Sequence, residues 1–563
     1  MSQGRAAATV WAGAIALLAV VAVWPLARLG MEAFTRDGVP SLGNFAETLG
    51  REENLVALRR SLEVSVASTV LSTMVGSLLA WLVGRTDLPW RRFFRTAFVL
   101  PFLVPPFIGA IAWAYLLGPS GFANRLWMAA SGASEPFFVI YGPVGIVLVL
   151  VLHGFPLVYL TVLGGLERMN PELEEAAQIA GSPAVRVLRE VTLPLMLPTV
   201  LAGAVLTFTS DIADFGIPAV LGFSEGYFVL PVKIYQQIAR GFGDPNSLSN
   251  AAALSCLLLL AGTAAILFQR SLLRGDRAQR YAVISGKSLQ PNIVRLGRSR
   301  RWLFALAVAL VIVTTVLPVL AIALSSLVRA VGLSPAPENW TLEHYADVLT
   351  TLPAAGRGIR NSLLLAAGSA TAIAVLGALI AYVVTRTALR GRAFLDLAAS
   401  LPYAVPGTVF ALGVILAWLR PFPDIAFTLY NTIWILFVAY IGRYFIFGVR
   451  TTAASLAQVH GGLEEAARIS GASWLRTFRD VVAPLVLPGL FAAWFLVFIP
   501  TLRELTVSIL LWSAGNETIG VMVFNLRESG QEGPSAALSM VMIALLVAAN
   551  YAARVLTRGR VGY

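Results

Sequence analysis

Long apolar stretches recur along the whole chain, and each is about as long as a membrane-spanning helix. The hydrocarbon core of a bilayer is roughly 30 Å thick, which takes about 20 apolar residues in helical form. The first stretch is longer than the core of a signal peptide and lacks a small-residue cleavage site, so we expect it to be a true span. The pattern therefore predicts an all-α polytopic membrane protein with about twelve spans, at 8–31, 61–84, 96–118, 138–164, 197–223, 249–270, 303–328, 361–385, 395–419, 430–452, 487–512 and 534–556.

The apolar pattern is repeated once. Residues 61–86 match 362–387, and VLPFLVPP at 99–106 matches SLPYAVPG at 400–407, both at an offset of 301 residues. A unit of six spans returns to the side of the membrane on which it started. The two copies should therefore enter the membrane from the same side, as two parallel six-helix repeats with a transport pathway between them.

Positive charge sets the expected orientation. Cytoplasmic loops of membrane proteins carry the excess of lysine and arginine, and the connection after the sixth span holds nine such residues between 270 and 301. With that connection inside the cell, both chain termini are cytoplasmic. We assign the first half to residues 1–275, a basic linker to 276–302 and the second half to 303–563. The net charge of +12 is mostly this signal and does not indicate nucleic-acid binding.

Composition narrows the function classes further. Hydrophobic residues make up 57% of the chain and charged residues 13%, far outside the range of soluble globular domains. The single cysteine, Cys256, lies in a predicted span, so the chain can form neither an internal disulfide nor a thiolate metal cluster. The three histidines, His153, His344 and His460, are scattered and indicate no zinc or catalytic site.

Two charged segments interrupt the apolar pattern at corresponding places. LEEAAQIAGSPAVRVLREVTLPL (173–195) and LEEAARISGASWLRTFRDVVAPL (463–485) are identical at 12 of 23 positions, and each follows the fourth span of its half. We call them the paired segments. Their glutamates suit the positive end of a helix dipole, and their glycine permits the left-handed turn that ends a helix. We expect cytoplasmic loops at about 168–195 and 458–485 that fold as helix, turn and helix, either resting on the bilayer or gripped by a duplicated soluble partner.

The paired segments resemble the EAA loop of permease subunits of bacterial ABC importers. Each copy has its glycine four positions after the alanine pair and a proline 13 positions after that glycine, Pro194 or Pro484. The residues that carry the resemblance are Glu174, Glu175, Ala176, Ala177 and Gly181 in the first copy, and Glu464, Glu465, Ala466, Ala467 and Gly471 in the second. The resemblance implies the type I importer permease fold, with each loop acting as a coupling helix in a cleft of an ATP-binding subunit.

The same resemblance implies the partners. They are two copies of an ABC ATPase, an extracytoplasmic solute-binding protein and the lipid of a bacterial inner membrane. The chain itself is expected to be no enzyme and to hold no cofactor, with ATP and Mg²⁺ bound by the ATPase. Gly286, Lys287 and Ser288 look like the end of a phosphate-binding loop, but Tyr281 stands where that loop needs its first glycine.

Three shorter sequence segments indicate the cargo. Residues 280–291, 214–222 and 503–511 resemble fused permeases of the ferric iron importer group. Fused permeases for thiamine, polyamines or aminoethylphosphonate share the overall plan. The resemblance thus implies an importer that passes a delivered solute by alternating access, with ferric iron as the first choice.

Charged residues inside predicted spans 5 and 11 are candidates for the translocation path, because ionisable groups within a membrane are costly. They are Asp211, Asp214, Arg503 and Glu504, and an offset of 290 superposes Asp214 on Glu504. Carboxylates suit a hard cation such as ferric iron and equally suit a cationic organic solute. The alternative is that these charges sit at helix ends and pair with one another or reach the interface.

The competing class is an ATP-independent secondary transporter, because the major facilitator group also has twelve helices in two parallel halves. Such a transporter needs no duplicated helix-turn-helix after spans 4 and 10. The paired segments therefore favour the importer.

Overall fold

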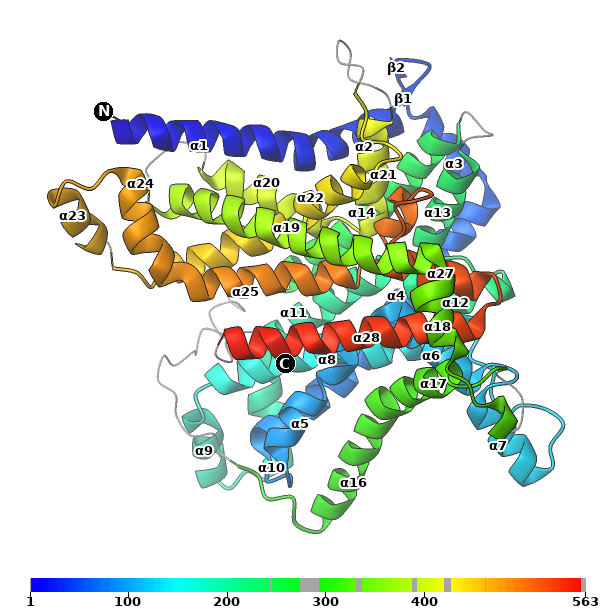
Figure 1. The fold of residues 1–563 in the computed structure, drawn as a ribbon. Coiled ribbons are helices and arrows are strands. Elements are labelled where there is room, and N and C mark those ends of the chain that lie inside the picture. Colours follow the sequence, from blue (N-terminus) through cyan, green and yellow to red (C-terminus); the bar gives the residue numbers. More distant parts are fainter. Residues whose placement is uncertain are drawn as a thin grey trace.

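The structure is a computed structural model that describes residues 2–241, 246–273, 293–330, 337–386, 392–419, 427–460 and 462–557. Most of the predicted linker lies outside the described residues, including the run at 280–291 and the Gly286, Lys287 and Ser288 triplet. Within the described parts the chain is almost entirely helical (Figure 1). Helices satisfy every backbone polar group internally, which a chain in a membrane must do.

The first half begins with two helices and a short antiparallel hairpin of β1 (Thr35–Arg36) and β2 (Val39–Pro40). Its helices are α1 (Ser2–Leu18), α2 (Trp24–Phe34), α3 (Gly43–Gly50), α4 (Glu52–Arg85), α5 (Arg91–Ala97), α6 (Pro106–Leu117), α7 (Phe122–Ser131), α8 (Pro143–Arg168), α9 (Glu172–Ile179), α10 (Ala184–Val187), α11 (Leu193–Ile212), α12 (Gly216–Gly222), α13 (Leu230–Arg240) and α14 (Ser247–Leu272).

The described residues of the second half follow the same order, apart from the hairpin and α7, which have no counterpart among them. Its helices are α16 (Arg300–Val311), α17 (Leu317–Ser326), α18 (Glu343–Ala346), α19 (Pro353–Arg386), α20 (Arg392–Ala404), α21 (Gly407–Trp418), α22 (Ile433–Leu456), α23 (Gly462–Ile469), α24 (Trp474–Thr477), α25 (Ala483–Leu502), α26 (Ser508–Leu511), α27 (Ile519–Glu528) and α28 (Glu532–Leu556). Five-residue π-helical turns join α1 to α2 and α10 to α11, and they recur between α16 and α17 and between α24 and α25.

Eleven helical stretches in the described parts are long and apolar enough to cross a membrane, and each overlaps a predicted span. The remaining prediction, 395–419, corresponds to a pair of helices, Leu397–Ala404 and Gly407–Trp418, bent by 113°. A second bent pair, Gly216–Glu225 and Leu230–Arg240, was not predicted and has an angle of 78°. The predicted all-α polytopic fold is confirmed.

Predicted spans 5 and 11 continue too far. Helix α11 ends at Ile212 rather than near residue 223, and α25 ends at Leu502 rather than near residue 512. The chain then turns into the short helices α12 and α26. Apolar residues continue on both sides of each turn, so the length of the apolar stretch did not show the breaks, although the turns themselves hold Asp214, Arg503 and Glu504.

The two halves are interlocked by their first spans. Helix α2 packs on α21 of the second half, and α17 packs on α6 of the first half. Figure 1 shows α1 and α2 lying along the second half, with α16 and α17 on the opposite side of the molecule. The central core therefore contains side chains from both halves, such as Ile234 from the first half and Phe410 from the second.

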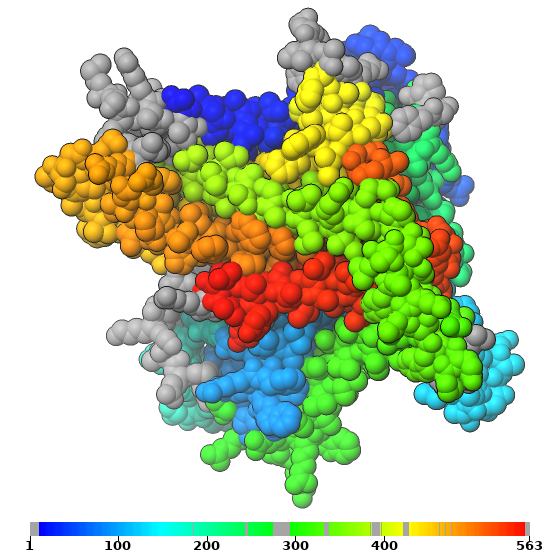
Figure 2. All heavy atoms as spheres, in the orientation of Figure 1, coloured from blue at the N-terminus to red at the C-terminus, as the bar shows by residue number. Residues whose placement is uncertain are grey.

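Both paired segments lie at the same end of the helix bundle. In Figure 1, α9 and α10 and their counterparts α23 and α24 project at the left, the side on which α1 begins and α28 ends. The β1–β2 hairpin, α7 and α27 lie at the other end. The space-filling view shows the second paired segment standing out from the body of the protein (Figure 2).

Candidate functional site

Each paired segment forms a helix that ends in a glycine turn. Gly181 and Gly471 have φ angles of 84° and 81°, a left-handed conformation that other residues adopt only with strain. The Ser182 amide donates to the Ala177 carbonyl at 3.0 Å, and the equivalent bond in the second segment has the same length. This is the bond pattern that closes a helix C-terminus.

The second helix of each segment is not a separate surface helix, as the sequence had suggested. It continues through a π-helical turn into the next span, so that Val185–Ile212 forms one membrane-crossing stretch. Pro194 lies in the first turn of α11 without interrupting it. Each segment is therefore a short helix and a turn, rigidly joined to the fifth span of its half.

The first glutamate of each segment is a buried anchor. Glu174 pairs with Arg85 of α4 at 3.3 Å, and its carboxylate accepts a hydrogen bond from the Thr192 hydroxyl at 2.7 Å. Glu464 is also buried and accepts a hydrogen bond from the Tyr382 hydroxyl of α19 at 2.7 Å. These contacts tie α9 and α23 to the second span of their own half.

The rest of each segment presents an exposed face. Glu175 and Glu465 are exposed, whereas the glutamate before each is buried. Ile179 and Ile469 are each 88% exposed, at the same position in the two segments. Ala176 and Ala466 are exposed as well, and Ala177 and Ala467 are half-buried. Two large apolar side chains held in solvent at equivalent places indicate a contact surface.

A cavity of about 190 Å³ lies between the two halves. Its position explains why charged residues are present at the turns after α11 and α25. The first half contributes Pro106, Phe107, Asp214 and Gly216, and the second half contributes Tyr403, Arg443, Tyr444, Pro500, Arg503, Glu504, Leu505 and Thr506.

Asp214 and Glu504 occupy equivalent positions and make equivalent bonds. Asp214 accepts the Ile217 amide at 2.8 Å, and Glu504 accepts the Val507 amide at 2.8 Å. Each carboxylate therefore stabilises the start of the short helix that follows, as a helix-capping side chain does. Both are helix-end charges, as in the alternative interpretation, and both also line the cavity.

Of the remaining polar groups, Arg503 links the halves, and Tyr444 and Arg443 lie against Glu504. Arg503 donates to the Phe102 carbonyl of the first half at 2.7 Å and lies 4.7 Å from the centre of the Phe102 ring. Glu504 accepts a 2.5 Å hydrogen bond from the Tyr444 hydroxyl. Arg443 is 4.0 Å from the same carboxylate. The cavity thus holds two acidic and two basic side chains.

Asp211 does not belong to this cavity. Its carboxylate is buried against α4, where it accepts a 2.5 Å hydrogen bond from the Ser68 hydroxyl. The structure therefore brings together three of the four predicted path residues and separates the fourth. Among the described residues, no three His, Cys, Asp or Glu side chains converge to hold a metal ion.

Sequence reasoning missed several residues of both sites. Arg443 and Tyr444 lie in predicted span 10, where an arginine inside an apolar stretch was a usable signal. Ile179 and Ile469 were identical in the two segments, but an isoleucine in an amphipathic helix is normally read as a buried residue. Only the structure shows that these two are exposed.

A repeated helical membrane domain with a polar cavity between its halves, and a projecting segment on each half, defines a membrane permease. The chain belongs to the family described as the binding-protein-dependent transport system inner membrane component, whose model matches residues 72–275 and 373–561. Each match covers most of one half with its paired segment. The resemblance drawn from the paired segments is therefore confirmed, and the chain is a multi-pass inner-membrane protein with two permease domains.

Individual relatives match nearly the whole chain. The ferric transport system permease protein FbpB of Actinobacillus pleuropneumoniae is 24% identical over 95% of this chain and 76% of its own length. The Fe(3+)-transport system permease protein FbpB 2 of Haemophilus influenzae is 26% identical over 94% of this chain and 95% of its own. A bacterial alginate ABC transporter, solved in complex with an alginate pentasaccharide-bound periplasmic protein, aligns with a TM-score of 0.37 and 20% identity over 44% of this chain and 85% of that chain.

Proposed function

We propose that this chain is the permease of an ATP-driven importer and that each paired segment docks one ATP-binding subunit. The observation that carries the proposal is the repeated exposed face, in which Ile179 and Ile469 stand in solvent beside Glu175 and Glu465. A partner that is itself duplicated would find the same surface on both halves. ATP and Mg²⁺ are then bound by that partner.

The anchors give a route by which movement of a docked subunit reaches the membrane. Glu174 holds α9 on α4, and the π-helical turn joins the same segment to α11. In the second half Glu464 holds α23 on α19. A displacement of either exposed face would therefore move two spans of its half together, as alternating access requires.

This assignment fixes an orientation. The end of the bundle with the paired segments, where α1 begins and α28 ends, faces the cytoplasm. A solute-binding protein delivers its cargo at the opposite end, near the β1–β2 hairpin and α7. The cavity between the halves lies on the path between these two ends.

We propose ferric iron as the cargo, because the relatives named above as ferric permeases match more than nine tenths of the chain. Asp214 and Glu504 supply the oxygen ligands that a hard cation prefers. Two carboxylates are too few for a closed metal cage, so the ion would bind them weakly and pass on. Arg443 and Arg503 in the same cavity make an oxyanion the second candidate cargo.

Uptake into vesicles tests the proposal. The chain is reconstituted with its ATP-binding subunit and its binding protein, and ferric iron uptake is measured with ATP or with a non-hydrolysable analogue. Sulfate, molybdate, thiamine, a polyamine and aminoethylphosphonate serve as competitors. We expect iron uptake that requires hydrolysis and that none of these solutes reduces.

The outcomes separate the two parts of the proposal. Uptake that persists without hydrolysable ATP would make the chain a secondary transporter. ATP-dependent uptake of another solute, with none of iron, would keep the importer and overturn the cargo.

A further inference from the structure

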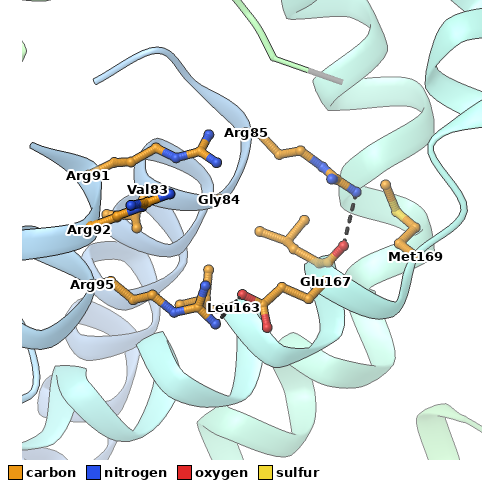
Figure 3. Close-up of a pocket in the computed structure, with 10 residues that line it drawn as sticks. Val83, Gly84, Arg85, Arg91, Arg92, Arg95, Leu163, Glu167 and Met169 are labelled. Atoms are coloured by element: carbon orange, nitrogen blue, oxygen red, sulfur yellow. Dashed lines mark hydrogen bonds and ion pairs between the residues drawn. The ribbon is translucent and has the colours of Figure 1, made fainter. Parts of the chain in front are cut away.

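A second, larger cavity lies beside the first paired segment and takes no part in the path between the halves. It has a volume of about 410 Å³, within the range of about 300–1,000 Å³ typical of ligand pockets. It opens among the ends of α4 and α8 and helix α5 (Figure 3). Its polar and flexible lining residues are Arg85, Arg91, Arg92, Arg95, Glu167 and Met169.

Two of the four arginines are held by the protein. Arg85 is buried, pairs with Glu174 and donates to the Leu166 carbonyl at 3.0 Å. Arg95 pairs with Glu167 at 2.5 Å. Both guanidinium groups are thereby fixed at the wall of the cavity, as Figure 3 shows.

The other two arginines have no such partner. Arg91 and Arg92 are exposed, and neither has a hydrogen bond or an ion pair to another described residue. In Figure 3 both extend from α5 into the same space as Arg95, facing Arg85 across the cavity. The lining therefore carries four positive charges and one negative charge, and two of its guanidinium groups are open to a ligand.

Only part of the cluster is shared by the two halves, since Arg85 and Arg91 correspond to Arg386 and Arg392 at the offset of 301 residues. At the offset of 301 residues, the second half has Ala393 in place of Arg92 and Asp396 in place of Arg95. At the offset of 290, Ala457 stands in place of Glu167. A permease half of this kind thus folds without these side chains, which points to a separate role for them in the first half.

The neighbouring aromatic residues place the cavity at the level of the lipid headgroups. Trp90 is 70% exposed and Phe93 is 54% exposed, and they flank Arg91 and Arg92 on α5. Trp302, at the start of the adjacent α16, is 80% exposed. Tryptophan is enriched where a membrane protein crosses the membrane–water interface. Guanidinium groups bind phosphate through paired hydrogen bonds, which suits the headgroups found at that level.

We propose that this cavity binds the phosphate headgroup of an anionic phospholipid from the leaflet on the side of the paired segments. Arg91 and Arg92 contact the phosphate and supply the net positive charge, and Arg85 and Arg95, each paired with a glutamate, form the wall behind it. Basic pockets between membrane helices recognise anionic headgroups in this way. Because Arg85 also pairs with Glu174, the bound lipid lies directly behind the anchor of α9.

The test uses the full-length chain, purified in detergent and stripped of lipid. Native mass spectrometry measures the binding of added phosphatidylglycerol and phosphatidylcholine, and inorganic phosphate is the third probe. The variant is Arg91→Gln with Arg92→Gln. The control is Arg298→Gln with Arg301→Gln, which removes the same charge from two exposed arginines near the start of α16.

We expect the wild-type chain to bind phosphatidylglycerol in preference to phosphatidylcholine. The Arg91/Arg92 variant should bind phosphatidylglycerol roughly thirtyfold more weakly, since each of the two arginines near a membrane surface contributes about one kcal/mol. The control should bind like the wild type. The increase in melting temperature on adding phosphatidylglycerol should shrink in parallel, which checks the result independently of yield.

Three results would overturn the proposal. If the variant and the control lost phosphatidylglycerol binding equally, the loss would come from the general surface charge and not from this cavity. Unchanged phosphatidylglycerol binding in the variant would show that the cavity does not bind the lipid headgroup. Saturable binding of inorganic phosphate without binding of phosphatidylglycerol would make the ligand a soluble anion.

Discussion

At the residue scale, neighbouring glutamates in one motif have opposite environments. The sequence predicts that both glutamates of a paired segment lie in the first turn of a helix. It does not predict that Glu174 is buried, because its partner Arg85 lies on another element and is far away in the sequence. A contact of this kind depends on how helices are placed, and no local pattern encodes it.

The two glutamates should therefore respond differently to substitution. Glu174→Gln leaves Arg85 buried without its counter-charge, a change that costs on the order of 3 kcal/mol. Glu175→Gln alters an exposed side chain and should change stability by less than about 0.5 kcal/mol. We expect a lower melting temperature only for the first variant, and a loss of ATP-driven uptake at unchanged melting temperature for the second.

The comparison is made by thermal denaturation of the purified full-length chain, with Glu464→Gln and Glu465→Gln as the matched pair in the second half. Equal melting temperatures for Glu174→Gln and Glu175→Gln would show that the buried ion pair does not anchor α9.

At the element scale, the spans follow from hydrophobicity, but their breaks do not. Eleven spans could be predicted because about 20 apolar residues in a row have no other stable arrangement in a membrane. The turns after Ile212 and Leu502 lie within otherwise apolar stretches, and each is stabilised by a single carboxylate, Asp214 or Glu504. The sequence marked these residues as costly charges without showing that they start new helices.

Packing between the spans depends on glycines at equivalent positions. A Cβ atom on Gly76 of α4 would lie 2.7 Å from the Phe155 carbonyl oxygen of α8. A Cβ atom on Gly377 of α19 would lie 2.8 Å from the Gly448 carbonyl carbon of α22. Small residues at such crossings let membrane helices approach closely, and the repeat preserves the feature in both halves.

We expect Gly76→Ala and Gly377→Ala each to destabilise the chain by about 1–3 kcal/mol, because the added methyl group meets backbone atoms that cannot move aside. Gly262→Ala in α14 is the control, since a Cβ atom there meets nothing within 4 Å. Melting temperature and the yield of monodisperse protein are the measurements. Destabilisation of all three variants alike would show that loss of backbone freedom, rather than close packing, explains the effect.

At the scale of the whole molecule, the repeat determines what could be predicted. Two six-helix halves, their parallel arrangement and the position of the paired segments all follow from the sequence offsets. The interlocking of the first spans does not follow, because α2 and α17 pack on the half to which they do not belong in sequence. Nor does the basic cavity of the first half, because the repeat does not preserve Arg92 and Arg95.

The central claim is that both paired segments are docking surfaces for a duplicated ATP-binding subunit. Ile179→Asp with Ile469→Asp places a charge at the same exposed point of both segments and should leave the fold intact. Leu42→Asp with Leu342→Asp is the matched control, since these leucines are 67% and 69% exposed and directly precede α3 and α18, which lie away from the paired segments in Figure 1.

The most direct measurement is the affinity of the purified full-length chain for its ATP-binding subunit. We predict that the isoleucine variant binds at least about tenfold more weakly, the loss expected when a central apolar contact is removed. The leucine control should bind like the wild type. Unchanged affinity in the isoleucine variant would contradict the account.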